Sequence, residues 1–149
     1  MAARYRRIVH ATDFSPASRR AFAEAVTLAR ANRAELVLMH VVDTTVPVVE
    51  DAYVSARAVE RLITSARTDA AKRLDALVRK ARSAGVRARG ELLDGNPRDA
   101  IARAARRKGA DLLVVGTHGR TGLRKLFLGS VAERIVGTAH CPVLTVRGR

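Results

Sequence analysis

Three glycines and one serine near the carboxyl end of the chain have residue types and a spacing that suit the binding of an anion. They are Gly116, Gly119, Gly129 and Ser130. An apolar run at 111–115 directly precedes them, and 131–136 directly follows with the pattern of a helix. A helix N-terminus presents unpaired N–H groups, and glycines let the backbone adopt positive φ and approach a phosphate closely. The order of strand, glycine loop and helix start therefore predicts a cradle for nucleotide phosphates.

The same loop carries side chains that suit a polyphosphate. Arg120, Arg124 and Lys125 lie between the second and third of these glycines and would supply positive charge. The loop lacks both the Gly-Lys-Ser/Thr ending of the P-loop and the Gly-x-Gly opening of a dinucleotide fingerprint, so neither standard template applies. For His118 and Arg120 two alternatives stay open, which are contact with phosphate and exposure to solvent.

Two polar residues have a structural alternative to a role in binding. Ser130 and Glu133 together form a capping box, in which the serine oxygen would cap the helix and be partly occupied. Asp13 comes directly after the apolar strand expected at 6–12. Its carboxylate could hydrogen-bond a ribose hydroxyl, hold a metal ion through water, or cap the helix that begins at Ser15 and Pro16.

The sequence identifies no catalytic residue. The histidines have no metal-ligand spacing; they are His10, His40, His118 and His140. No nucleophile with an adjacent base and no paired carboxylates can be located. The only cysteine, Cys141, precedes an apolar strand and is expected to be a buried thiol, so an internal disulfide is excluded. These patterns favour binding over turnover.

The chain of 149 residues has the length of one domain, so we expect a single domain over residues 1–149. No apolar run approaches membrane-spanning length and no signal-peptide pattern opens the chain, so a cytoplasmic protein is expected. The net charge of +14 raises the alternative of a nucleic-acid partner. Because the basic residues are spread over polar helix faces and only 3% of residues are aromatic, any nucleic-acid binding should be non-specific.

Five segments have the composition of strands and alternate with helical segments. The strands are expected at 6–12, 35–42, 86–92, 111–115 and 142–146, and the helices begin near 16, 56, 97 and 130. Such alternation predicts an α/β, Rossmann-like fold, with an open, twisted, parallel five-stranded sheet and helices on both faces. If the first and fourth strands are neighbours, a crevice opens between Asp13 and the glycine loop. That arrangement favours the strand order 3-2-1-4-5.

The two edge strands of this sheet differ in charge. The third strand carries Arg87, Arg89 and Glu91, which discourage pairing with another strand. The last strand, Val143–Val146, has no charge until Arg147. Its unpaired backbone groups need a cover, and an identical strand related by a two-fold axis would supply one. We therefore expect a homodimer joined through the last strand.

The spacing Gly116-x-x-Gly119, nine residues and Gly129-Ser130 resembles the nucleotide-binding signature of the universal stress protein family. The resemblance extends over essentially the whole chain. Its other parts are residues 11–15 after the first strand, 39–43 after the second and 141–144 at the last. It implies the same strand order and dimer, and binding of ATP, or of ADP or AMP, together with Mg²⁺.

The resemblance also implies roles for single residues. In the family, residues at the positions of Ala11 and Asp13 border the nucleoside, and backbone groups at the position of Val41 hold the adenine. The glycine segments, the second of which continues into Ser130 and Val131, bind the phosphates. The implied function is a nucleotide-dependent regulatory or stress-response module with at most slow hydrolysis. Two alternatives stay open: a true nucleotide hydrolase or phosphotransferase, and a basic nucleic-acid-associated protein.

Overall fold

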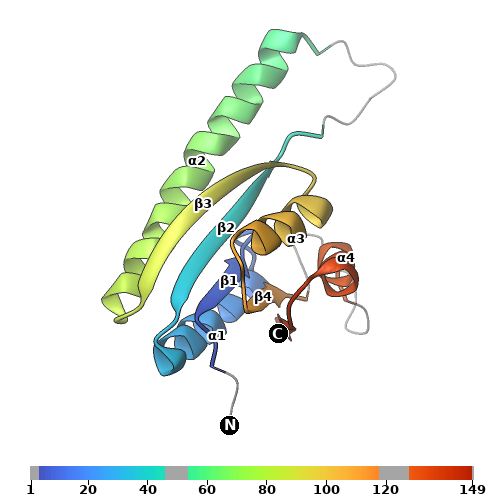
Figure 1. Cartoon of the computed structure of the whole chain (residues 1–149). Helices are drawn as coiled ribbons and strands as arrows, with labels where there is room; N and C mark the ends of the chain where they lie inside the picture. The colour runs from blue at the N-terminus through green and yellow to red at the C-terminus, as the bar shows by residue number, and fades with distance from the viewer. Residues whose placement is uncertain (1–3, 46–53, 118–127, 149) are drawn as a thin grey trace.

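The computed structural model describes residues 4–45, 54–117 and 128–148 of the chain (Figure 1). Its elements are β1 (Arg7–Ala11), α1 (Pro16–Asn32), β2 (Glu35–Asp43), α2 (Ala56–Ser83), β3 (Arg87–Gly95), α3 (Pro97–Arg107), β4 (Leu112–Gly116), α4 (Ser130–Thr138) and β5 (Val143–Val146). Within these residues the strands form one sheet in the order β3-β2-β1-β4-β5, and every neighbouring pair is parallel. The predicted fold class and strand order are therefore confirmed.

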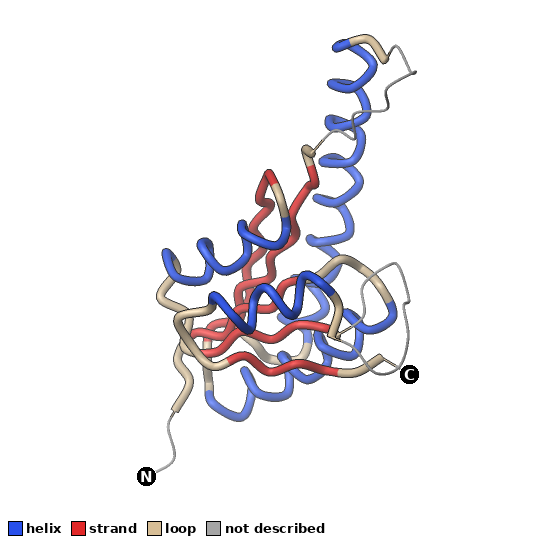
Figure 2. The backbone as a smooth tube through the Cα atoms, turned by 90° about the vertical axis from the view of Figure 1, so that its right-hand side faces the viewer, coloured by secondary structure: helices blue, strands red, loops and turns tan. Residues whose placement is uncertain are grey.

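Helices cover both faces of the sheet (Figures 1 and 2). α1 and α2 pack on the face that buries Ile8 and Leu36, and α3 and α4 pack on the face that buries Val9 and Leu113. The central strands are nearly continuous apolar runs because helices exclude water from both of their faces. The helices that follow β1 and β4 lie on opposite faces, which leaves a crevice at the carboxyl ends of these two neighbouring strands.

Local sequence sets the ends of the helices. Ser15 is the N-cap of α1, and its hydroxyl accepts a hydrogen bond from the Ser18 N–H at 3.2 Å. Asn96 caps α3 in the same way and accepts from the Arg98 N–H at 2.9 Å. A proline follows each cap, where its missing N–H costs nothing. These two boundaries are as predicted.

Two elements differ from the prediction. β3 runs to Gly95, beyond the expected end at 92, because it pairs with β2 along its whole length as far as Asp43. α2 has the expected length, but its buried residues all lie in its carboxyl half; they are Ala70, Leu74, Val78 and Ala81. The predicted apolar stripe continued into the amino half, where Leu62 is instead 67% exposed. The amino half extends past the end of the sheet, where nothing in the described residues covers it (Figure 2).

α2 is a helix of 28 residues that carries charged side chains along its whole length. Length alone would allow such a helix to cross a bilayer, but a spanning helix also needs a nearly uncharged apolar surface. In the parts of the chain that the structure describes, no helix combines the required length and hydropathy.

Candidate functional site

A cavity of about 680 Å³ lies at the carboxyl ends of β1, β2 and β4. The β1–α1 turn, the start of α4, one flank of α2 and the first turns of α3 complete its wall. The sequence-predicted residues on this wall are Ala11, Asp13, Val41, Gly116, Gly129, Ser130 and Val131. The remaining predicted residues, His118, Gly119 and Arg120, lie outside the described residues. Parallel strand order thus brings the two predicted halves of the site to one cavity.

Hydrogen bonds fix the β1–α1 turn that carries Asp13. The Asp13 carboxylate accepts from the Ser15 N–H at 2.9 Å, and the Thr12 hydroxyl oxygen accepts from the Phe14 N–H at 3.0 Å. Thr12 also accepts from the Ser18 hydroxyl at 2.6 Å, which ties the turn to the first turn of α1. Of the alternatives for Asp13, this geometry shows a local turn contact, while Ser15 provides the helix cap. The half-buried carboxylate also lines the cavity, so its geometry is held ready for a ligand.

Phe14 has an unusual backbone conformation at the cavity wall. Its φ of 62° lies in the left-handed region, which costs a non-glycine residue on the order of 1 kcal/mol. Its ring stacks on His40, with centroids 4.5 Å apart, and the Arg73 guanidinium of α2 lies 5.6 Å from the ring centroid. The His40 Nδ1 lies 2.8 Å from the carbonyl oxygen of Thr12. The stack therefore joins the turn, β2 and α2 at one wall.

Sequence reasoning placed none of Phe14, His40 and Arg73 in the site. Phe14 adjoins Asp13, so its position next to a predicted site residue was a usable signal. Nothing in the spacing of α2 charges distinguishes Arg73 from its neighbours. Its place in the wall follows only from the packing of α2 on β2 and the turn.

Gly116 has a packing role that the sequence analysis did not anticipate. A Cβ atom on Gly116 would lie 3.0 Å from the carbonyl carbon of Ala17 and 3.1 Å from the Ser18 nitrogen. Contacts this short with backbone atoms are tighter than most real Cβ contacts, so a side chain here would push the start of α1 aside slightly. The close approach of β4 to the start of α1 therefore favours glycine here, apart from any phosphate.

The start of α4 does not have the capping box that Ser130 and Glu133 suggested. Gly129, not Ser130, is the N-cap, and among the described residues no side chain makes a capping hydrogen bond to α4. The φ of Gly129 is −58°, so the positive φ expected of the loop glycines does not occur at this position. The Gly129 N–H donates to the carbonyl oxygen of Thr117, which joins the end of β4 to the start of α4. Ser130 and Val131 lie at the cavity in the first turn of this uncapped helix.

His10 lies beneath the site, and only one of its two ring nitrogens has a hydrogen-bond partner among the described residues. The side chain is fully buried beside Phe22 of α1, with ring centroids 6.1 Å apart. Its Nδ1 lies 3.0 Å from the carbonyl oxygen of Val114 and donates to it, because a carbonyl can only accept. The buried Nε2 has no hydrogen-bond partner among the described residues. Burial lowers the pKa of His10 to about 4, so the ring is neutral at pH 7.

The described residues contain no group of three or more His, Cys, Asp or Glu side chains that could hold a metal ion. Asp13 is a carboxylate on the cavity wall, and the nearby Asp43 and Asp69 lie at the end of β2 and on α2. The side chains that the structure describes therefore offer oxygen ligands singly and not as a closed cage.

Comparison with known proteins agrees with the observed fold. The model of the universal stress protein family matches residues 4–147 of the chain. The chain belongs to this family. A universal stress protein of Methanocaldococcus jannaschii is 38% identical over 143 residues, which are 96% of this chain and 82% of that protein.

Solved structures of this family share the fold. A universal stress protein from Lactobacillus plantarum superposes with a TM-score of 0.86 at 26% identity and covers 98% of this chain and 100% of its own. A universal stress protein solved in complex with cAMP has a TM-score of 0.74 at 27% identity and covers 99% of this chain and 100% of its own.

Proposed function

We propose that this universal stress protein binds an adenine nucleotide in the cavity at the carboxyl ends of β1, β2 and β4. ATP is the expected form, with ADP or AMP as alternatives. The observation that carries the proposal is the convergence of Asp13, Val41 and the amino end of α4 on one cavity. Its volume of about 680 Å³ falls in the range of sites for small ligands. The relative in complex with cAMP supports an adenine nucleotide.

The start of α4 suits the phosphate end of this ligand. Because no side chain in the described part of the chain caps α4, we expect the N–H groups of its first turn and the Ser130 hydroxyl to be available to phosphate oxygens. The positive end of the helix dipole adds attraction for an anion. We assign His118, Gly119 and Arg120 to the same phosphate cradle, on the strength of their place in the loop that joins β4 to α4.

The β1–α1 turn and β2 suit the nucleoside end. We assign Ala11 and Asp13 to the ribose side and the backbone of Val41 to the adenine. These residues line the cavity from β1, the β1–α1 turn and β2, which are distant in sequence from the glycine loop. Asp13 is held by Ser15, so it can accept from a ribose hydroxyl without reorganisation. Mg²⁺ usually binds one or two carboxylates together with substrate phosphates. We propose such an ion at the phosphates of the bound nucleotide and assign none of the described side chains to it.

We infer that the protein acts in the cytoplasm as a nucleotide-dependent regulatory or stress-response module with at most slow hydrolysis. Fast hydrolysis needs a base positioned to activate water. The cavity histidine, His40, instead packs on Phe14 and contacts the Thr12 carbonyl. This arrangement supports binding over turnover.

We also propose the homodimer joined through Val143–Val146. β5 is an edge of the sheet with β4 on one side only, and all four of its residues are half-buried. An edge strand of this kind exposes a row of unpaired N–H and C=O groups. A second copy of β5 would pair with them.

The first experiment identifies the nucleotide released when the purified protein is denatured. An adenine nucleotide in near-stoichiometric amount supports the proposal. Calorimetric titration with ATP, ADP and AMP then ranks the three ligands. A protein that carries none of them, and binds none at about 1 mM, has another function.

Three variants test the assigned contacts. Gly119→Val should lower affinity for ATP a hundredfold or more, about 3 kcal/mol, because it blocks close approach of phosphate. Asp13→Ala should cost about tenfold, since water readily replaces a partly solvated contact. Ser130→Ala should also cost about tenfold while changing stability little, because Ser130 is not the cap of α4.

The matched control for Ser130→Ala is Ser65→Ala on the exposed amino half of α2. Its affinity and stability should equal those of the parent protein. If Ser130→Ala lowers stability by about 1 kcal/mol and leaves affinity unchanged, the hydroxyl acts as a helix cap in solution. A folded Gly119→Val protein that binds ATP like the parent would place the site elsewhere.

A further inference from the structure

Arginines gather at the amino ends of the strands, opposite the cavity described above, which lies at their carboxyl ends. Arg6 directly precedes β1, Arg33 lies just before β2, and Arg87 begins β3. Because these three strands are parallel neighbours, their amino ends lie side by side and bring the three arginines together. Arg4 joins them, and the four arginines with Tyr5 and Asn32 line a cavity of about 500 Å³. We call these four residues the arginine cluster (Arg4, Arg6, Arg33 and Arg87).

The cluster has no carboxylate of its own. Neither Asp nor Glu lines the cavity, and in the described residues none of the four arginines forms an ion pair. Two carboxylates near the amino ends of these strands are engaged elsewhere. Glu35 pairs with Arg7 and Arg89, each at 2.7 Å, and Asp111 accepts the backbone N–H groups of Arg6 and Arg7. The positive charge of the cluster is therefore not neutralised within the described chain.

The carboxyl end of α1 accounts for only a small part of the cluster. The Arg4 Nε donates to the Asn32 carbonyl at 3.2 Å, and Arg87 donates to the Arg33 carbonyl at 3.5 Å. A helix carboxyl end carries roughly half a negative charge, against four guanidinium groups here. Each guanidinium has five N–H donors, so most donors in the cavity are not used by these two bonds. The helix end positions two arginines and leaves a net positive cavity.

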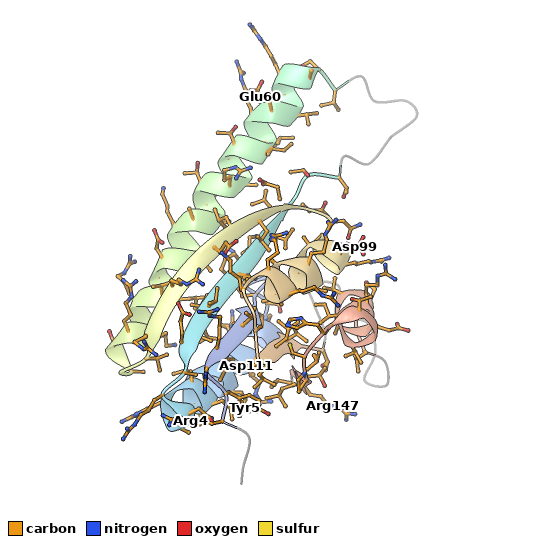
Figure 3. All side chains as sticks on the ribbon, in the orientation of Figure 1. Arg4, Tyr5, Glu60, Asp99, Asp111 and Arg147 are labelled. Carbon is orange, nitrogen blue, oxygen red and sulfur yellow. The ribbon has the colours of Figure 1, made fainter. Side chains whose placement is uncertain are left out.

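We propose that the arginine cluster is a second binding site, which takes a compact anion with two or more phosphate groups. Guanidinium groups form bidentate, charge-assisted hydrogen bonds with phosphate oxygens, and several of them at one cavity suit a polyphosphate. Tyr5 is partly buried against the core and also lines the cavity (Figure 3, where Arg4 and Tyr5 are labelled). The site lies at the amino ends of the strands, so it does not depend on the nucleotide proposed at their carboxyl ends.

The experiment titrates the full chain with inorganic tripolyphosphate at low salt and follows the backbone amide NMR signals of Tyr5, Arg6 and Arg33. These signals report on the cluster alone, even if tripolyphosphate also binds at the glycine loop. A saturable shift with one dissociation constant is expected. The constant should rise steeply with salt, because the contacts are partly exposed.

Two variants test the assignment. Arg33→Gly removes a guanidinium and should fold, because Arg33 has φ of 53°, which glycine adopts readily. Arg6→Gln removes a second guanidinium and keeps the backbone N–H that Asp111 accepts. Each should weaken tripolyphosphate binding about tenfold, which corresponds to about 1.4 kcal/mol. Arg61→Gln, on the exposed half of α2, makes the same change in net charge and should alter the constant less than about twofold.

Equal weakening by Arg61→Gln and the two cluster variants would show that net charge alone attracts the anion, and would overturn the proposal. Absence of a saturable shift up to about 5 mM would overturn it as well. A competing single-stranded oligonucleotide identifies the source of the phosphates. Displacement of tripolyphosphate by the oligonucleotide at equal phosphate concentration would overturn the assignment to a compact anion, and failure of the oligonucleotide to compete supports a free polyphosphate.

Discussion

The buried His10 makes the stability of this protein depend on pH in a defined window. Its pKa is lowered from 6.5 to about 4 by burial, and its Nε2 has no hydrogen-bond partner among the described residues. The unfolded chain therefore takes up a proton on His10 at a higher pH than the folded chain does. Protonation favours unfolding, so this contribution to stability is fully present above pH 6.5 and is lost as pH falls from 6.5 to 4.

The size of the loss follows from the two pKa values. A difference of one unit corresponds to about 1.4 kcal/mol, so the full loss below pH 4 is about 3 kcal/mol. Between pH 7.5 and pH 5 the same linkage relation gives about 2 kcal/mol. That is a large part of the 5–15 kcal/mol typical of a folded domain. Glu35 adds little between pH 7.5 and pH 5, because the Arg89 and Arg7 side chains hold its pKa below the ordinary value of 4.5 and its contribution is lost only as pH falls below about that value.

The assay is urea denaturation of the parent protein and of His10→Leu at several values of pH from 7.5 to 5. Leucine keeps the site apolar and removes the titrating group, so the difference between the two proteins isolates His10 from the other histidines. We expect the parent to lose about 2 kcal/mol more than the variant across this range. Equal pH dependence of the two proteins would refute the reasoning, since it would mean that His10 reaches solvent in the folded state.

Three further predictions concern packing and assembly. A Cβ on Gly116 would lie 3.0 Å from the carbonyl carbon of Ala17. Gly116→Ala should therefore lower the free energy of unfolding, measured by urea denaturation, by about 1–3 kcal/mol. A variant that stays stable but cannot bind ATP would instead favour a role of Gly116 in phosphate binding. Leu74→Ala should lower the free energy of unfolding by about 2–5 kcal/mol, because Leu74 is only 3% exposed. Leu62→Lys should lower it by less than about 0.5 kcal/mol, because Leu62 is 67% exposed. Similar losses in the two variants would mean that the amino half of α2 is covered in solution. Leu144→Arg should halve the mass measured by light scattering, and a parent protein that is already monomeric at micromolar concentration contradicts the dimer.

Much of the fold could be predicted because its signals are local. Ser15 with Pro16 and Asn96 with Pro97 mark helix starts through contacts made within a few residues. The apolar runs of β1, β2 and β4 result from burial on both faces of the sheet. Alternating strands and helices then leave few possible topologies, since crossovers are right-handed and chains avoid knots. The strand order followed from placing the two chemically unusual strand ends side by side.

The details of the candidate site depend on residues that are distant in sequence. Ser130 and Glu133 fit a capping box, yet the structure starts α4 at Ser130 with Gly129 as the cap, because a hydrogen bond from Gly129 to Thr117 fixes the entry of the chain. Gly116 looks like a phosphate-loop glycine, but the backbone of α1 determines what fits beside it.

Tertiary structure alone decided which charges meet. Arg73 reaches the cavity at the carboxyl ends of the strands from α2. Arg6, Arg33 and Arg87 meet at the amino ends of the strands although long segments separate them in the chain. The sequence by itself determined that the protein is strongly basic and that its helices have polar faces. A charge pattern along the chain contains no information on distance in space. The order of the parallel strands is set by burial of apolar residues that are far apart in sequence. Only this order brings the evenly spread arginines close together in space.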